Sequence, residues 1–413
     1  MQQAALIFAF FLIVTAIVFV SITLAYLIDY FEKNTKFSAA FLSGIVFSTI
    51  NSFPEFITSI LSCYNVGSNC DSIFSNLLGG NMFILFSLGI VTVIFIKKFN
   101  KRKVLLSNII NICALILCYA LLAYATIAPW NMQVYFTAHG VHLGSEENHS
   151  GFNLISLFIM LIYLGMFIYS TFIENKSETS TNSVKLPKWL NKINMKFAVI
   201  IFCSLSIGII GISVGLSFVD ESLIEMWFGS DKGSFGATLL LGIPTSIPEL
   251  ISIILLCKIK NYDAAYQTII GSCLFSVFAL TLCDALTTHI SGWTIYDFNF
   301  SDYSMKNIWT CDEYNIVTLS LLMSLLFAMW LICCLFKKGS KIGVGICSGA
   351  NVVIFLIYLL LGFLYMSFPQ DNILLNTLAI NNSCKQDLLH YPYCCNKSYV
   401  HQFFENLNVH KIW

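Results

Sequence analysis

The sequence predicts an all-α polytopic membrane protein, with ten transmembrane helices in two inverted five-helix repeats. The first observation is composition: the 413 residues are 57% hydrophobic and only 11% charged, whereas a soluble domain has about 25% charged residues. The second is that apolar runs of roughly 20 residues, the length needed to cross a bilayer, recur along the chain. The third is a Pro-Glu motif at Pro54 and Glu55 that returns 194 positions later at Pro248 and Glu249.

Apolar runs separated by polar links give the predicted helices in chain order. The first run lacks the basic leading segment and the small-residue cleavage site of a signal peptide, so we interpret it as the first transmembrane helix. The ten predicted helices cover residues 4–29, 37–63, 72–96, 104–126, 152–174, 196–218, 234–258, 262–288, 315–336 and 342–367.

Basic residues are concentrated in alternate links. Of the 22 Lys and Arg residues, 17 lie in the links that follow helices 1, 3, 5, 7 and 9 or at the helix ends that border these links, and cytoplasmic loops carry such an excess. We therefore expect both termini on the non-cytoplasmic side of the plasma membrane. The net charge is zero and no basic tract is present, so the expected partners are the lipid bilayer and inorganic cations, with no nucleic acid and no protein partner indicated.

The second half of the chain repeats the first. A second block follows each Pro-Glu motif, LLGGNMF at 77–83 and IIGSCLF at 269–275. The copies occupy residues 37–96 and 234–288, and an odd separation of five helices gives them opposite orientations, as in secondary transporters. The predicted organisation is a first repeat over 1–174, a cytoplasmic linker over 175–195, a second repeat over 196–368 and a non-cytoplasmic tail over 369–413.

The repeated stretches place carboxylates where they are costly, at least about 2.5–3.5 kcal/mol near the bilayer centre. Each proline lacks an N–H and breaks the helical ladder, which frees carbonyls one turn earlier, near Ser48 and Gly242. Polar residues one turn before the glutamates add oxygens suited to hard cations such as Ca²⁺ and Na⁺. The cluster contains no His or Cys, which argues against a soft transition metal. The oxygen-bearing residues are Asn51, Ser52, Thr245 and Ser246. The small residues Gly79, Gly80, Gly271 and Ser272 favour close helix packing.

The pattern T-S-x-P-E, followed about 20 residues later by G-S-N-x-x-N/D and present twice, resembles the cation/calcium exchanger superfamily. Here it reads NSFPE…GGNMFI and TSIPE…GSCLFS. The connecting sequences YLIDYFEKNTKFSAAFLSGI and KNYDAAYQTIIGS are similar to those of bacterial-type sodium/calcium antiporters. The resemblance covers the two motif regions, and the helix layout extends it over residues 1–368.

The resemblance implies roles for individual residues. The motif glutamates Glu55 and Glu249 would be the principal ion ligands, and helices 1 and 6 would slide against the core. Further ligand positions fall on Asn51, Ser52, Thr245, Ser246, Ser272 and Ser276, with backbone carbonyls at Ser48 and Gly242. The chain departs from the pattern at Gly80 and Ile84, which supply no side-chain oxygen, and at Cys273, which replaces the Asn kept as Asn81.

Together these features predict a secondary antiporter that exchanges Ca²⁺, or a similar divalent cation, for Na⁺ by alternating access. No enzymatic activity and no cofactor are expected; the transported ions would be Ca²⁺ and Na⁺ or H⁺. Two alternatives stay open: an H⁺-coupled exchanger of Ca²⁺, Mn²⁺ or Mg²⁺, and a transport-inactive relative that acts as a membrane scaffold or sensor.

Overall fold

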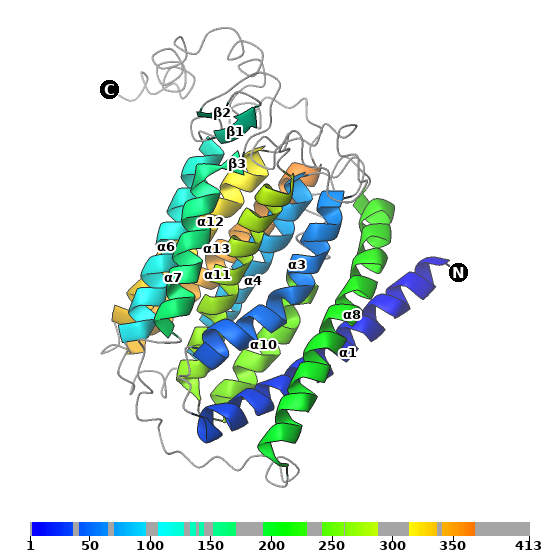
Figure 1. Cartoon of the computed structure of the whole chain (residues 1–413), viewed down its shortest axis with the longest axis vertical. Helices are drawn as coiled ribbons and strands as arrows, with labels where there is room; N and C mark the ends of the chain where they lie inside the picture. Colours follow the sequence, from blue (N-terminus) through cyan, green and yellow to red (C-terminus); the bar gives the residue numbers. More distant parts are fainter. Residues whose placement is uncertain are drawn as a thin grey trace.

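Long apolar helices make up almost all of the described structure (Figure 1). The computed structural model describes residues 2–35, 41–64, 70–95, 106–127, 133–137, 140–143, 152–170, 193–228, 242–259, 261–287, 314–336 and 341–367. The predicted tail over 369–413, most of the predicted linker over 175–195, and residues 234–241 of the predicted seventh helix lie outside these ranges.

The elements follow the predicted order of apolar runs, with three short strands added. The helices in the first half are α1 (Gln2–Asn34), the π-helix η1 (Leu42–Phe47), α3 (Ser48–Tyr64), α4 (Cys70–Ile94), α6 (Leu106–Ile127) and α7 (Leu154–Ile168). Those in the second half are α8 (Met195–Phe228), α10 (Ile243–Lys258), α11 (Tyr262–Thr287), α12 (Tyr314–Phe336) and α13 (Lys341–Ser367). The strands are β1 (Gln133–Thr137), β2 (Gly140–Leu143) and β3 (Phe152–Asn153).

Helix ends differ from the prediction where polar residues continue a helix. Helix α1 runs to Asn34 rather than 29, and α8 runs to Phe228 rather than 218. Hydropathy identifies the part of a helix that can lie in lipid. The helix itself can continue beyond that part, because Asp, Glu and Lys are tolerated in a helix that extends out of the bilayer. The predicted helices at 4–29 and 196–218 were therefore too short.

A small sheet occupies part of the polar link between the fourth and fifth predicted helices. Strand β1 pairs antiparallel with β2, placing Val134 opposite Leu143, and with β3, placing Gln133 opposite Asn153. The alternating aromatic and β-branched residues of β1 favour a strand. The predicted start of the fifth helix at residue 152 is wrong, because residues 152–153 belong to β3 and α7 begins at Leu154.

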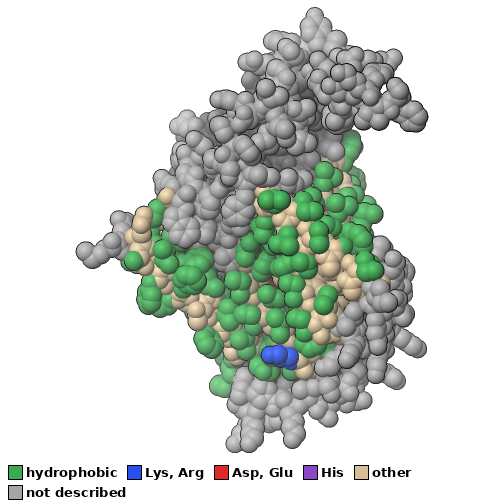
Figure 2. Space-filling model, turned by 180° about the vertical axis from the view of Figure 1, so that it is seen from behind, with side chains coloured by type: hydrophobic (Ala, Val, Ile, Leu, Met, Phe, Trp, Pro, Cys, Tyr) green, Lys and Arg blue, Asp and Glu red, His purple; other side chains and the backbone are tan. Residues whose placement is uncertain are grey.

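The outer surface suits a lipid environment. Large apolar side chains are exposed on α1 and α8, for example Phe8 at 69% and Ile207 at 70%, and Figure 2 shows a broad hydrophobic face with a basic side chain near its lower edge. In the described part of the chain, four helical stretches are long and apolar enough to span a bilayer: Gln3–Asn34, Asn76–Ile94, Met195–Leu216 and Ala264–Cys283. The chain is an integral membrane protein; the number of ten spans stays a prediction.

Glycines allow the motif helices to meet closely in the interior. A Cβ built on Gly271 of α11 would overlap the carbonyl oxygen of Gly44 in η1. A Cβ on Gly242, just before α10, would lie 3.0 Å from the backbone nitrogen of Gly80 in α4. Only residues without a side chain fit these crossings, so α3 and α10 pack against α4 and α11, while α1 and α8 lie together along one side of the molecule (Figure 1).

Candidate ion-binding site

The two motif glutamates lie in the interior and are hydrogen-bonded to each other's motif. Glu55 of α3 is 0% exposed and Glu249 of α10 is 1% exposed. The Ser246 hydroxyl donates to Glu55 Oε1 at 2.6 Å, and the Ser52 hydroxyl donates to Glu249 Oε1 at 2.8 Å. Each serine precedes its own glutamate by three residues and serves the other one. The two copies therefore form a single site.

Hydroxyl groups of α10 and α11 complete the partners of the carboxylates. Ser272 donates to Glu249 Oε1, and its hydroxyl oxygen lies in close contact with that of Ser52. The hydroxyl of Ser276 donates to Glu55 Oε2 and that of Thr245 to Glu55 Oε1, both at 3.4 Å. Neutral hydroxyls are thus the partners that the structure gives the carboxylate oxygens, the hard-donor chemistry that Ca²⁺ and Na⁺ prefer.

The first copy of the second block contributes backbone rather than a hydroxyl. A Cβ at Gly80 would lie 2.8 Å from Glu55 Oε1 and 3.0 Å from Ser246 Oγ. Glu55 therefore lies directly against the backbone of α4 at Gly80, and Gly80 is the position equivalent to Ser272 of α11. The site is asymmetric: at this position of the second block Glu249 has the hydroxyl of Ser272, whereas Glu55 meets Gly80. Gly79 also lies at this crossing, with its carbonyl carbon 3.4 Å from a Cβ at Gly242.

Several polar atoms near the glutamates are buried without a hydrogen-bond partner. They are both side-chain atoms of Asn51, which lies one turn before Glu55, and Oε2 of Glu249. Leaving such a group unsatisfied costs about 1–3 kcal/mol, and native structures keep few of them unless they serve a role. Oxygens of this kind are suitable ligands for a cation.

The prolines do not break the helices as predicted. Pro54 lies inside α3, which is continuous from Ser48 to Tyr64, and Pro248 lies within α10. The N–H that Pro248 lacks would pair with the carbonyl of residue 244, so a single ladder bond is lost. The Gly242 carbonyl at the start of α10 lies 2.7 and 3.3 Å from the hydroxyls of Ser246 and Thr245. The irregular segment is the π-helix η1, which precedes Ser48.

Ser48 belongs to the wall of the site. Its hydroxyl donates to the Gly44 carbonyl at 2.6 Å, and a Cβ at Gly271 would lie 2.7 Å from it. Ser48 therefore helps to close the crossing between η1 and α11, while a ligand role for its carbonyl stays a prediction.

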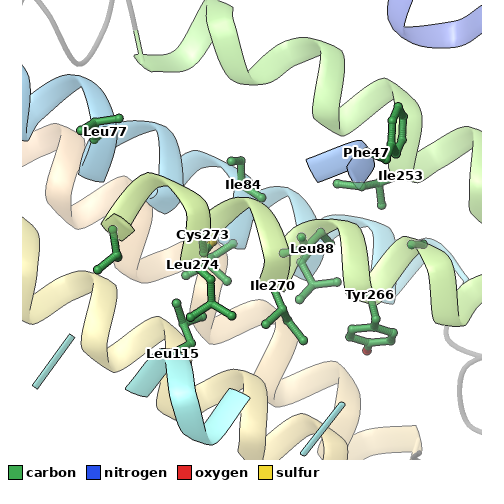
Figure 3. Close-up of a cluster of buried hydrophobic side chains, with 14 of the residues drawn as sticks. Phe47, Leu77, Ile84, Leu88, Leu115, Ile253, Tyr266, Ile270, Cys273 and Leu274 are labelled. Atoms are coloured by element: carbon green, nitrogen blue, oxygen red, sulfur yellow. The ribbon is translucent and has the colours of Figure 1, made fainter. Parts of the chain in front are cut away.

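The positions at which the sequence differs from the superfamily pattern have structural roles. Ile84 is 1% exposed and belongs to the hydrophobic cluster of Figure 3, together with Leu88 of α4 and Leu274 of α11. The Asn81 amide donates to the Tyr119 hydroxyl at 3.0 Å and to the Cys273 carbonyl at 3.3 Å. These positions therefore pack and link α4, α6 and α11.

Sequence reasoning missed Asn76 of α4. Its amide donates to the backbone carbonyl of Glu55 at 3.2 Å, to the hydroxyl of Thr58 at 2.7 Å and to that of Ser59 at 3.2 Å. Asn76 thereby fixes the backbone that carries Glu55. The available signal was its spacing, one helical turn before Gly80 and so on the same face of α4.

Comparisons with known proteins agree with this geometry. Residues 5–172 match the family model described as "Sodium/calcium exchanger protein", and no curated protein sequence gave a significant match. Among solved structures, the H⁺/Ca²⁺ exchanger CAX is similar with a TM-score of 0.61 and 12% identity, over 87% of this chain and 86% of that chain. The sodium-calcium exchanger NCX_Mj, soaked with Na⁺ and Ca²⁺, gives 0.54 and 14% over 86% and 97%.

Native YfkE gives a TM-score of 0.53 and 15% identity, over 85% of this chain and 91% of its own. At such identities these structures establish a shared fold, while the family match covers less than half of the chain, the part that carries Glu55. Residues 5–172 thus match the model of the sodium/calcium exchanger family, and the chain shares its fold with the solved structures of the H⁺/Ca²⁺ exchanger CAX and the sodium-calcium exchanger NCX_Mj.

Proposed function

We propose that the protein exchanges Ca²⁺, or a similar divalent cation, for Na⁺ across the membrane by alternating access. The observation that carries this proposal is the pair of buried glutamates, each hydrogen-bonded to a serine of the other motif copy. Such an arrangement holds two negative charges within one oxygen-rich cage. The match of residues 5–172 to the sodium/calcium exchanger model supports cation antiport in general, and the choice of ions rests on the site.

The chemistry of the site favours a hard divalent cation. Its donors are carboxylate, amide, hydroxyl and carbonyl oxygens, the ligand types of Ca²⁺. Among the buried side chains that the structure describes, no Lys, Arg or His offsets the two carboxylates. A buried charge without a partner is strongly disfavoured, so a divalent ion is a matching occupant.

We propose the predicted ten-helix architecture for the whole chain, with inverted repeats over 1–174 and 196–368 joined by a cytoplasmic linker over 175–195. The reciprocal contacts between α3 and α10 support two equivalent halves. The asymmetry of basic residues in the links supports a plasma-membrane topology with non-cytoplasmic termini and a non-cytoplasmic tail over 369–413.

Helices α1 and α8 are the proposed moving elements. The Tyr30 hydroxyl of α1 donates to the carbonyl of Ile193, just before α8, at 3.2 Å. The rings of Phe31 and Phe202 meet edge to face, with centroids 5.4 Å apart. These contacts tie the two helices together, so they would slide as one unit past the site. An empty site exposes two carboxylates to an apolar barrier, and this opposes movement until a cation is bound.

An H⁺-coupled exchanger of Ca²⁺, Mn²⁺ or Mg²⁺ is the second candidate. The observation that favours it is the absence of side-chain oxygen at Gly80 and Ile84, positions that would otherwise add ligands for Na⁺. Burial also disfavours the charged form of a carboxylate, which makes a proton a natural competitor of the cation. Flux that follows a pH gradient and ignores Na⁺ would favour this candidate.

Transport in reconstituted vesicles tests the proposal. Wild-type protein is expected to take up radioactive Ca²⁺ when a Na⁺ or pH gradient is imposed in the opposite direction, and Glu55→Gln is expected to abolish this uptake. No gradient-driven uptake by the wild type, together with no Ca²⁺-dependent thermal stabilisation, would instead support the transport-inactive scaffold or sensor.

A further inference from the structure

We propose that the side chain of Asn261 is a latch that holds the moving helix α1 to the hairpin formed by α10 and α11, and that this latch opens in each transport cycle. The inference rests on the proposed function, in which α1 and α8 slide past the site. Asn261 is then a positioning residue for transport that lies outside the ion-binding site.

Asn261 lies in the short link between α10, which carries Glu249, and α11, which carries Ser272. Its side-chain oxygen accepts a hydrogen bond from the Ala264 backbone N–H at 3.3 Å and so caps the start of α11, a position that favours Asn. Its backbone N–H donates to the Leu256 carbonyl of α10 at 2.9 Å. Asn261 is therefore fixed to both helices of the hairpin that carries half of the site.

The nitrogen of the same amide binds the end of α1. Nδ2 of Asn261 donates to Glu32 Oε2 at 2.6 Å and to Asp29 Oδ1 at 3.4 Å. Both acidic residues are buried, with Glu32 4% and Asp29 2% exposed, and Asp29 also pairs with Lys33 at 2.6 Å. A buried carboxylate needs such partners, so the hydrogen bonds from Asn261 stabilise the position of α1 against the hairpin.

The end of α1 uses two different faces for its two neighbours. Asp29 and Glu32 are three residues apart and therefore share one face of the helix, which contacts Asn261. Tyr30 and Phe31 lie between them in sequence, on another face, and tie α1 to α8. When α1 and α8 slide together past the hairpin, the contacts with α8 are kept and the hydrogen bonds from Asn261 have to break.

The latch is separate from the ion ligands. Asn261 precedes Ser272 by eleven residues, a distance of about 16 Å along a helix that rises 1.5 Å per residue. Changes at sites that far apart and without shared partners act independently. A change at Asn261 is therefore expected to alter how fast the site moves and to leave the affinity of the site for Ca²⁺ unchanged.

Exchanging the amide and the carboxylate across this contact tests the latch. Asn261→Asp keeps a side-chain oxygen that caps α11, because Asp is as good a cap as Asn, but it removes the donor and places a second carboxylate against Glu32. Glu32→Gln replaces a charged acceptor by a neutral one. The double variant supplies the donor from α1 and the carboxylate from the hairpin, so it restores the contact in the opposite sense with the net charge of the wild type.

Ca²⁺ uptake into vesicles under an opposing Na⁺ or pH gradient gives a maximal rate and a KM for Ca²⁺. Rates are expressed per Ca²⁺-binding site, counted by equilibrium dialysis, so that misfolded protein does not contribute. Asn261→Asp is expected to change the maximal rate at least about tenfold and Glu32→Gln about fivefold, because a hydrogen bond to a charged group is a strong one. The rate rises if leaving the conformation of the structure limits the cycle, and it falls if the return to it does. The double variant should recover most of the wild-type rate, and the KM should stay unchanged throughout.

Asn34→Asp is the matched control. It makes the same amide-to-carboxylate change two residues from Glu32, at a side chain that donates to the Tyr30 carbonyl within α1 at 2.7 Å, and it should keep the wild-type rate.

Rate changes in both single variants, with recovery in the double variant at an unchanged KM, would support the latch. Several results would overturn the inference and leave the proposed exchange intact: a single latch variant with the wild-type rate, a double variant without recovery, a KM that changes as much as the rate, or a control that changes as much as Asn261→Asp. Absence of gradient-driven Ca²⁺ uptake by the wild type would overturn the proposed exchange itself, and the inference with it.

Discussion

Replacing Gly80 tests whether the asymmetry of the site arises from one missing hydroxyl. A Cβ at Gly80 would lie 2.8 Å from Glu55 Oε1 and 3.0 Å from Ser246 Oγ, so both side chains must shift. Alanine introduces only this crowding, which costs about 1–3 kcal/mol in a packed interior. Serine introduces the same crowding together with a hydroxyl that can donate to Glu55, as Ser272 donates to Glu249.

A hydrogen bond to a charged group contributes about 1.5–3 kcal/mol. Gly80→Ser is therefore expected to be more stable than Gly80→Ala by about that amount, and close to the wild type. The assay is thermal or denaturant unfolding of the purified protein in detergent, without Ca²⁺. Gly165→Ala is the control, because no atom lies within 4 Å of a Cβ at that position of α7. Equal stability of Gly80→Ser and Gly80→Ala, or an Ala variant as stable as the wild type, would refute the reasoning.

Three further changes probe other parts of the site. Asn51→Leu removes two buried polar atoms that have no partner, so we expect the Ca²⁺-free protein to gain about 1–3 kcal/mol while Ca²⁺ stabilises it less; thermal unfolding with and without Ca²⁺ measures both effects. Gly271→Ala forces a Cβ into the Gly44 carbonyl, and expression of folded protein should fall sharply, whereas Gly208→Ala, with no neighbouring atom within 4 Å, should keep it. Ser272→Ala removes the hydroxyl that serves Glu249 and should weaken Ca²⁺ binding about tenfold, the effect of about 1.4 kcal/mol, in a titration followed by calorimetry.

Much of the fold could be predicted because hydropathy reports directly on which stretches suit lipid. The ends of α1 and α8 could not, since charged residues continue both helices beyond the predicted ends. They are Glu32 and Lys33 in α1, and Asp220, Glu221 and Glu225 in α8. The hairpin of β1 and β2 was missed because its few alternating residues lie in a polar link. Backbone geometry was predicted least well: Pro54 lies inside a continuous α3, and the irregular turn is in η1.

The composition of the site could be anticipated because the motif occurs twice, and a glutamate in an apolar helix is costly unless it binds a cation or another polar group. The hydrogen bonds from the serine of each copy to the glutamate of the other could not be anticipated, because they depend on how α3 and α10 cross. Asn76 and Tyr119 were missed for a related reason: they act through the backbone of Glu55 and the amide of Asn81, and neither belongs to a repeated motif position. Gly80 was recognised as a departure, and its close contact with Glu55 emerged from the packing.

The central claim is that Glu55 and Glu249 form one site and act together on one divalent cation. Equilibrium dialysis of the purified protein with Ca²⁺ tests this claim most directly, with wild type, Glu55→Gln and Glu249→Gln compared at equal concentration. We predict one Ca²⁺ bound per wild-type chain and loss of that binding in each single variant, because either change leaves the divalent charge half compensated. Wild-type binding that persists in either variant, or no Ca²⁺ bound to the wild type, would contradict the account.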